Sequence, residues 1–69
     1  MINEKTINDV REEVLAVAVE SGARQAFWKA TDLYPEQAEN ILNQVSVKLE
    51  KMGKLKTSER LDQIIKESF

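Results

Sequence analysis

The sequence predicts an all-α fold, and three observations support this class. Apolar residues between positions 38 and 52 recur at the i, i+3, i+4, i+7 spacing of one helix face, at Ala38, Ile41, Leu42, Val45, Leu49 and Met52. Gly22, Pro35 and Gly53 divide the chain into segments of ordinary helix length. The chain has only 69 residues, enough for one domain over 1–69. We therefore predict a small bundle of three to four short helices, at about 7–21, 23–32, 35–52 and 58–68, with no sheet.

The first predicted helix covers residues 7–21. Thr6 is a candidate N-cap, and Asp9 stands three residues later, in the capping-box position. Apolar residues then follow a helical rhythm at Ile7, Val10, Val14 and Val17. Gly22 is a candidate end for this helix, but the sequence leaves open whether the helix continues through it.

The next two predicted helices cover residues 23–32 and 35–52. In the first, Ala23, Ala26 and Ala30 form a stripe of small residues that permits close packing, with Phe27 as its anchor. Pro35 disfavours helix at the residue before it and suits the first turn of the second. The acidic and basic residues of that helix match the signs of its dipole, with Glu36 and Glu39 near its start and Lys48 and Lys51 near its end. Gly53 is the expected residue after its C-cap.

A last helix is expected over residues 58–68, with Ser58 or Thr57 as its N-cap and Leu55 covering the bend that precedes it. The apolar stripes of the four segments together define the predicted core. Its members are Ile7, Val10, Val14, Val17, Phe27, Ile41, Leu42, Val45, Leu49, Leu61, Ile64 and Ile65.

Composition argues against catalysis and metal binding. The chain contains no histidine and no cysteine, so the commonest general base and the thiolate nucleophile are both missing. No glycine-rich phosphate loop is present. We expect no enzymatic activity, no catalytic residue, no metal, no cofactor and no small-molecule ligand.

The sequence also predicts no membrane association. The longest uninterrupted apolar run, 14–19, is far too short to span a bilayer, and the formal net charge is −2. The N-terminal residues lack the apolar stretch of a signal peptide, and the lack of cysteine suits a reducing compartment. A cytoplasmic protein is expected.

Several apolar residues fall outside the predicted core stripes, which favours a protein-binding role. Trp28 follows Phe27 and lies about 100° further round the helix, so the two cannot both face one small core. We predict a small regulatory or adaptor protein that binds a protein partner or itself, as a homodimer, through an apolar and aromatic helical surface. The predicted contact residues are Trp28, Tyr34, Val19 and Val47.

DNA binding is the alternative. Residues 23–56 contain a short alanine-rich helix, a turn at Leu33-Tyr34-Pro35 and a longer helix that ends in a lysine-rich segment, Val47 to Leu55. This pattern resembles the helix-turn-helix segment of winged-helix regulators. The resemblance implies a transcriptional regulator that reads the major groove with helix 36–51, through the amides of Asn40, Asn43 and Gln44, while Lys48 and Lys51 meet phosphates. We rank this second, because Glu36 and Glu39 would repel phosphate and residues 57–69 form a predicted helix instead of a wing.

Overall fold

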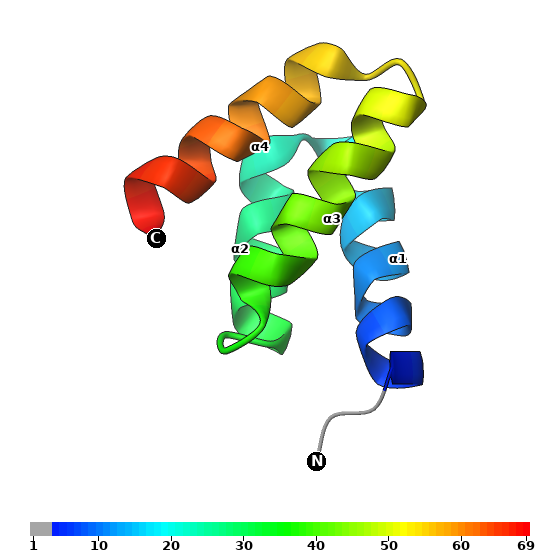
Figure 1. The fold of residues 1–69 in the computed structure, drawn as a ribbon, viewed down its shortest axis with the longest axis vertical. Helices are drawn as coiled ribbons and strands as arrows, with labels where there is room; N and C mark the ends of the chain where they lie inside the picture. The colour runs from blue at the N-terminus through cyan, green and yellow to red at the C-terminus, as the bar shows by residue number, and fades with distance from the viewer. Residues whose placement is uncertain (1–3) are drawn as a thin grey trace.

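A computed structural model describes residues 4–69 of the chain, and four α-helices account for most of this range (Figure 1). They are α1 (Glu4–Ser21), α2 (Ala23–Leu33), α3 (Ala38–Lys51) and α4 (Leu55–Ser68). No strand occurs between residues 4 and 69. The predicted all-α class is confirmed, with four helices.

Gly22 separates α1 from α2, so the first helix does not continue through it. Its backbone has φ 95° and ψ 176°, a conformation that residues with a side chain rarely adopt. The Gly22 amide still donates to the Ala18 carbonyl at 3.1 Å, while the Ala26 amide donates to the Gly22 carbonyl at 3.2 Å. One residue therefore ends one helix and starts the next.

Gly53 ends α3 in the predicted way. Its φ is 79°, and its amide donates to the Glu50 carbonyl at 3.0 Å. The Lys54 amide donates to the Leu49 carbonyl at 2.8 Å, which completes the hydrogen-bond pair of a Schellman motif.

The predicted helix starts are wrong in three places. Thr6 lies inside α1, which already includes Glu4, so Thr6 is not an N-cap. Pro35 precedes α3, because Tyr34–Gln37 form a turn closed by the Gln37 amide and the Tyr34 carbonyl at 3.1 Å. Proline is favoured at the second position of such a turn. Thr57 and Ser58 both lie inside α4, and the Ser58 hydroxyl donates to the Leu55 carbonyl at 2.8 Å. This local bond replaces the expected cap.

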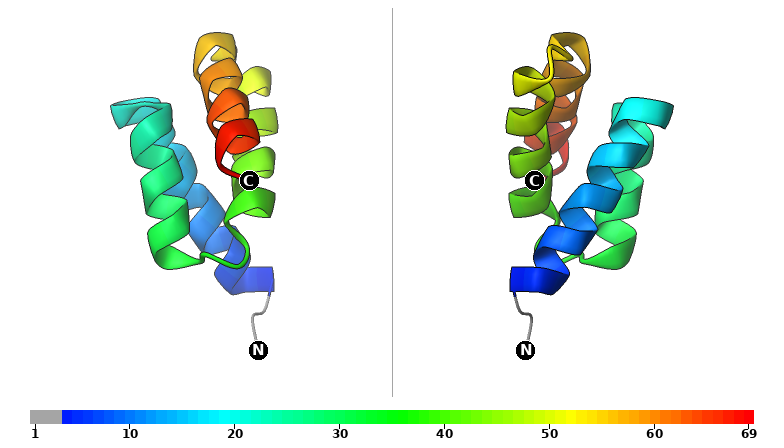
Figure 2. Two further views of the ribbon diagram at one scale, coloured as in Figure 1. Left: turned by 90° about the vertical axis from the view of Figure 1, so that its left-hand side faces the viewer. Right: turned by 90° about the vertical axis from the view of Figure 1, so that its right-hand side faces the viewer.

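The helices are arranged as two pairs (Figure 2). α1 packs along α2, α3 packs against α4, and contacts of α1 with α3 and of α2 with α4 join the pairs. The buried apolar core draws on all four helices, at Val10, Val14, Ala18, Ala23, Ala26, Ala30, Ala38, Ile41, Leu42, Val45, Leu49, Leu61 and Ile65.

The core differs from the predicted one mainly in its alanines. Ala23, Ala26 and Ala30 are buried, so α2 meets its neighbours through small side chains, as expected. Four predicted core residues, Ile7, Val17, Phe27 and Ile64, are only partly buried and pack against the rim of the core. Leu55 is 57% exposed, so the expectation that it covers the bend before α4 is wrong.

Candidate interaction surface

The helix α2 has one buried face and one exposed face. Ala26 and Ala30 are both fully buried, and Trp28 lies midway between them in sequence, about 200° round the helix from each. Its side chain is 53% exposed. The indole therefore stands near the centre of the helix surface that faces away from the core.

A shallow open depression adjoins Trp28 where α2 meets α1. It is lined from α1 by Val17 and Ser21 and from α2 by Gln25, Trp28, Lys29, Thr31 and Asp32. At its rim Lys29 Nζ lies 3.8 Å from Glu13 Oε1, an exposed ion pair that contributes little stability. The outer face of α2 thus combines a large apolar ring with a polar border.

Arg24 and Asp32 stand on either side of Trp28 along α2, each four residues away, or about 6 Å along the axis. Both are exposed. Neither takes part in an ion pair with any residue in the described range 4–69. We define the surface formed by exposed Arg24, Gln25, Trp28 and Asp32 together with half-buried Thr31 as the outer face of α2.

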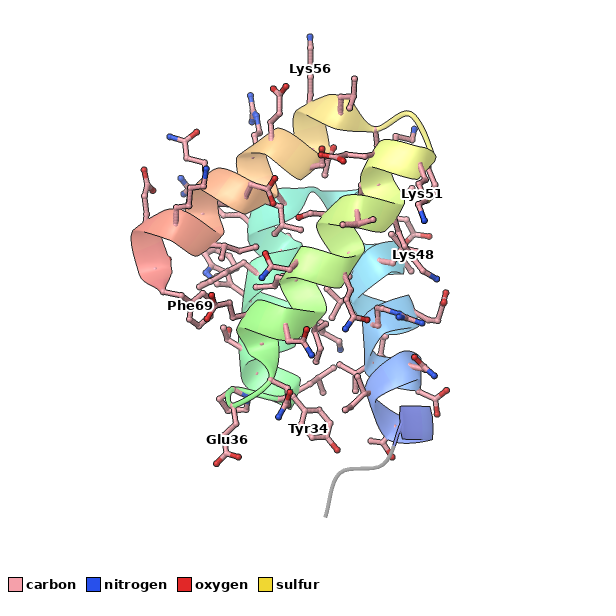
Figure 3. All side chains as sticks on the ribbon, viewed as in Figure 1. Tyr34, Glu36, Lys48, Lys51, Lys56 and Phe69 are labelled. Carbon is pink, nitrogen blue, oxygen red and sulfur yellow. The ribbon has the colours of Figure 1, made fainter. Side chains whose placement is uncertain are left out.

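The other three residues predicted for protein contact lie elsewhere. Val19 is 43% exposed on α1, about 200° round that helix from Val17, so it points away from the depression. Val47 is 51% exposed on α3, in the other helix pair. Tyr34 follows α2, is half-buried and packs against the core (Figure 3). Of the four, only Trp28 lies on the outer face of α2.

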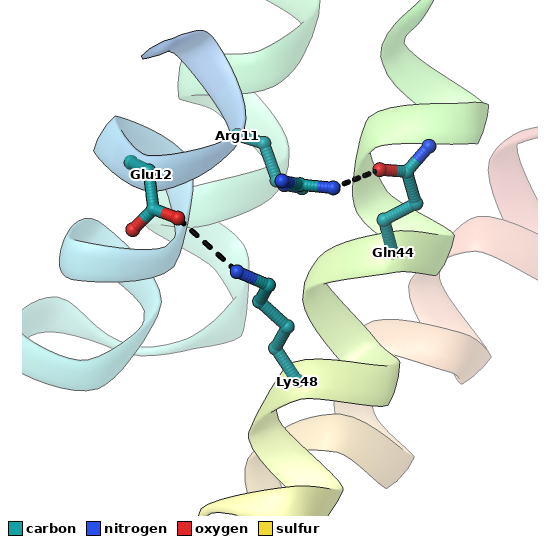
Figure 4. Close-up of polar contacts among 4 residues, drawn as sticks. All are labelled: Arg11, Glu12, Gln44 and Lys48. Atoms are coloured by element: carbon teal, nitrogen blue, oxygen red, sulfur yellow. Dashed lines mark hydrogen bonds and ion pairs between the residues drawn. The ribbon is translucent and has the colours of Figure 1, made fainter. Parts of the chain in front are cut away.

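Two of the five residues predicted for DNA contact bridge α3 to α1 (Figure 4). Arg11 Nη1 donates to Gln44 Oε1 at 2.7 Å, and Lys48 Nζ lies 3.1 Å from Glu12 Oε1. Gln44 Nε2 also donates to Asn40 Oδ1 at 3.3 Å. The amide of Gln44 and the ammonium of Lys48 therefore stabilise the α1–α3 contact.

The remaining DNA candidates, Asn40, Asn43 and Lys51, are exposed on α3. Lys51 lies near the end of the helix that meets α4, whereas Glu36 lies at the opposite end, within the turn that precedes α3 (Figure 3). The N-terminal end of α3 consequently carries negative charge at Glu36 and Glu39.

Of the outer face of α2, the sequence singles out only Trp28; Gln25, Thr31 and the two charged residues, Arg24 and Asp32, are found only in the structure. A signal for the two charged residues nevertheless exists in the sequence. In α2 the arginine is in the first turn and the aspartate in the last, the reverse of what the helix dipole favours. Comparing each charged residue with its place in the helix identifies both, together with others outside this surface, such as Lys56 in the first turn of α4 and Glu67 in its last turn.

Between residues 4 and 69 no group of three or more histidine, cysteine, aspartate or glutamate side chains is placed to hold a metal ion. None of the helices in that range has the length and apolar character needed to cross a bilayer. Comparison of the chain with protein-family models, with curated proteins and with solved structures finds no match.

Proposed function

We propose that this chain is a small non-enzymatic adaptor or regulator that acts in the cytoplasm by binding a polypeptide through the outer face of α2. The observation that carries the proposal is the exposure of Trp28, 53%, at the centre of a helix face opposite the core. Tryptophan is strongly enriched among residues that dominate binding energy at protein interfaces. The polar residues around it match the usual anatomy of an apolar centre with a polar rim.

DNA binding is the weaker candidate. Gln44 and Lys48 bind Arg11 and Glu12 of α1 and would have to give up these contacts to reach a groove. Glu36 and Glu39 would bring negative charge to the helix end that approaches phosphate in helix-turn-helix proteins. Exposed Asn40, Asn43 and Lys51 are what supports this candidate.

A photo-crosslinking experiment separates the two functions. A benzophenone amino acid replaces exposed Gln25, which lies beside Trp28 on the outer face of α2, in the full chain in its source cells, so that Trp28 itself is kept. A matched variant carries it at position 56, where Lys56 is exposed on α4 (Figure 3). We expect irradiation to join position 25, but not position 56, to a polypeptide, in an adduct that nuclease does not change.

Failure to form a polypeptide adduct at position 25 above the level at position 56 would overturn the proposal. An adduct that nuclease removes would instead support nucleic-acid binding. An adduct of twice the chain's mass identifies a second copy of the chain as the partner, and any other mass identifies a different protein.

A further inference from the structure

We infer that the outer face of α2 binds a second copy of this chain, with the two α2 helices antiparallel about a two-fold axis that passes beside Trp28. The inference rests on the proposed function, because it names the partner of the same surface. It is carried by the placement of charge on either side of Trp28.

The charges on the outer face of α2 are self-complementary. A two-fold axis perpendicular to two antiparallel helices makes every contact occur twice, and it sets residue 28 + n of one helix beside residue 28 − n of the other. Arg24 and Asp32 each lie four residues from Trp28. Arg24 of each copy therefore comes beside Asp32 of the other copy, and two opposite-charge pairs flank a central pair of indoles.

The helix dipole gives a second reason for the antiparallel direction. Arg24 is next to the positive N-terminal end of α2, and Asp32 is next to the negative C-terminal end, so each charge lies where its own helix disfavours it. An antiparallel partner reverses this, since Arg24 then lies near the C-terminal end of the second helix and Asp32 near its N-terminal end. The antiparallel arrangement therefore relieves both unfavourable placements at once.

The two charged side chains are also available for such pairs. Both are exposed, and within residues 4–69 neither has an ion-pair partner. A parallel arrangement of the two helices would instead bring Arg24 beside Arg24 and Asp32 beside Asp32, which is repulsive. The charge pattern therefore selects the antiparallel dimer.

Two exposed helix faces meet in this dimer, which makes the interface small. Standard-sized interfaces already range from micromolar to picomolar affinity, so we expect a dissociation constant of micromolar order or weaker. Attraction between the charged pairs is screened least at low ionic strength, since the Debye length is about 30 Å at 0.01 M salt, so the dimer should be most stable there.

Charge exchange between the two positions tests the inference. Sedimentation of the purified full chain at low salt should show a concentration-dependent dimer. Arg24→Asp alone and Asp32→Arg alone should each weaken it by roughly tenfold or more, because like charges then face each other twice. An equimolar mixture of these two variants should form a heterodimer with nearly the original affinity, and the double variant R24D/D32R should recover the homodimer.

Lys56→Asp and Glu59→Arg form the matched control, since both exposed residues lie on α4. These variants and their mixture should dimerise as the original chain does. A chain that remains monomeric at all concentrations, or single variants that keep full affinity, would overturn the inference, and so would a mixture that fails to restore the dimer. A polypeptide adduct at position 25 in cells would then leave the proposed function standing with a different partner.

Discussion

Two buried serines differ in whether their hydroxyl has a hydrogen-bond partner, and this difference should decide how each affects stability. Ser58 is fully buried on α4, and its hydroxyl donates to the Leu55 carbonyl at 2.8 Å. Ser46 is 3% exposed on α3, and no residue in the described part of the chain accepts or donates a hydrogen bond to its hydroxyl. Burial of a polar group without a hydrogen bond costs about 1–3 kcal/mol. The two positions therefore respond differently to the same substitution.

Ser46→Ala should increase the free energy of unfolding by about 1–2 kcal/mol, because it removes an unsatisfied hydroxyl and introduces the best helix former. Urea denaturation followed by circular dichroism measures the change. Ser58→Ala is the control, since it removes a made hydrogen bond and should give no such gain. A loss of stability in Ser46→Ala would show that its hydroxyl has a partner in solution.

At the scale of elements, helix ends fixed by backbone conformation were predictable and helix starts were not. Gly22 and Gly53 end α1 and α3 because positive φ suits glycine and few other residues. Pro35 and Ser58 are ambiguous signals. Proline is accepted in the first turn of a helix and also inside a β-turn, and serine can cap a helix or bond back to the preceding turn. The turn Tyr34–Gln37 and the Ser58–Leu55 bond are the alternatives that the chain adopts.

The sequence predicts the central residue of the candidate surface, Trp28, but not the residues around it. The 100° step from Phe27 to Trp28 predicts that one of the two rings turns away from the core, and Trp28 does. The sequence did not show which neighbours would join it. Val17 lines the depression beside Trp28 only because α1 and α2 pack side by side. Helical spacing within one segment does not report such a contact between helices.

The native charges of Arg24 and Asp32 oppose the dipole of α2, so they should lower the stability of the isolated chain. Arg24→Glu and Asp32→Lys should each increase the free energy of unfolding by about 0.3–1 kcal/mol at low salt, because each then matches the dipole of its own helix. Thermal unfolding at a concentration where sedimentation shows only monomer measures this. The gain should disappear in 1 M salt, where the Debye length is about 3 Å.

Lys66→Glu in the last turn of α4 is the control of opposite sign. Lys66 matches the dipole of α4, so reversal of its charge should lower stability. Equal stability of Arg24→Glu, Asp32→Lys and the original chain would show that the native charges do not lower the stability of α2. The dipole argument for the antiparallel dimer would then be wrong.

At the scale of the whole molecule, one core holds both helix pairs together. Leu49 of α3, Val14 of α1, Ala26 of α2 and Leu61 of α4 are all fully buried in it. Small chains bury a smaller share of their surface than large ones, so each core residue carries a large part of the stability. The four helices are therefore expected to unfold together, in one transition.

Leu61→Ala tests that expectation from the last helix. Loss of a fully buried leucine costs about 2–5 kcal/mol, whereas a 69-residue domain has about 3–10 kcal/mol in total on the usual range per residue. We expect the variant to lose a large part of its stability and to unfold in all four helices together at a lower urea concentration, as measured by circular dichroism and urea titration. Leu55→Ala on the same helix is the matched control, because Leu55 is 57% exposed and its loss should change stability by about 0.5 kcal/mol or less. A Leu61→Ala variant that loses only the helicity of α4, with α1 to α3 unfolding at the original urea concentration, would show that α4 is not part of a single cooperative core.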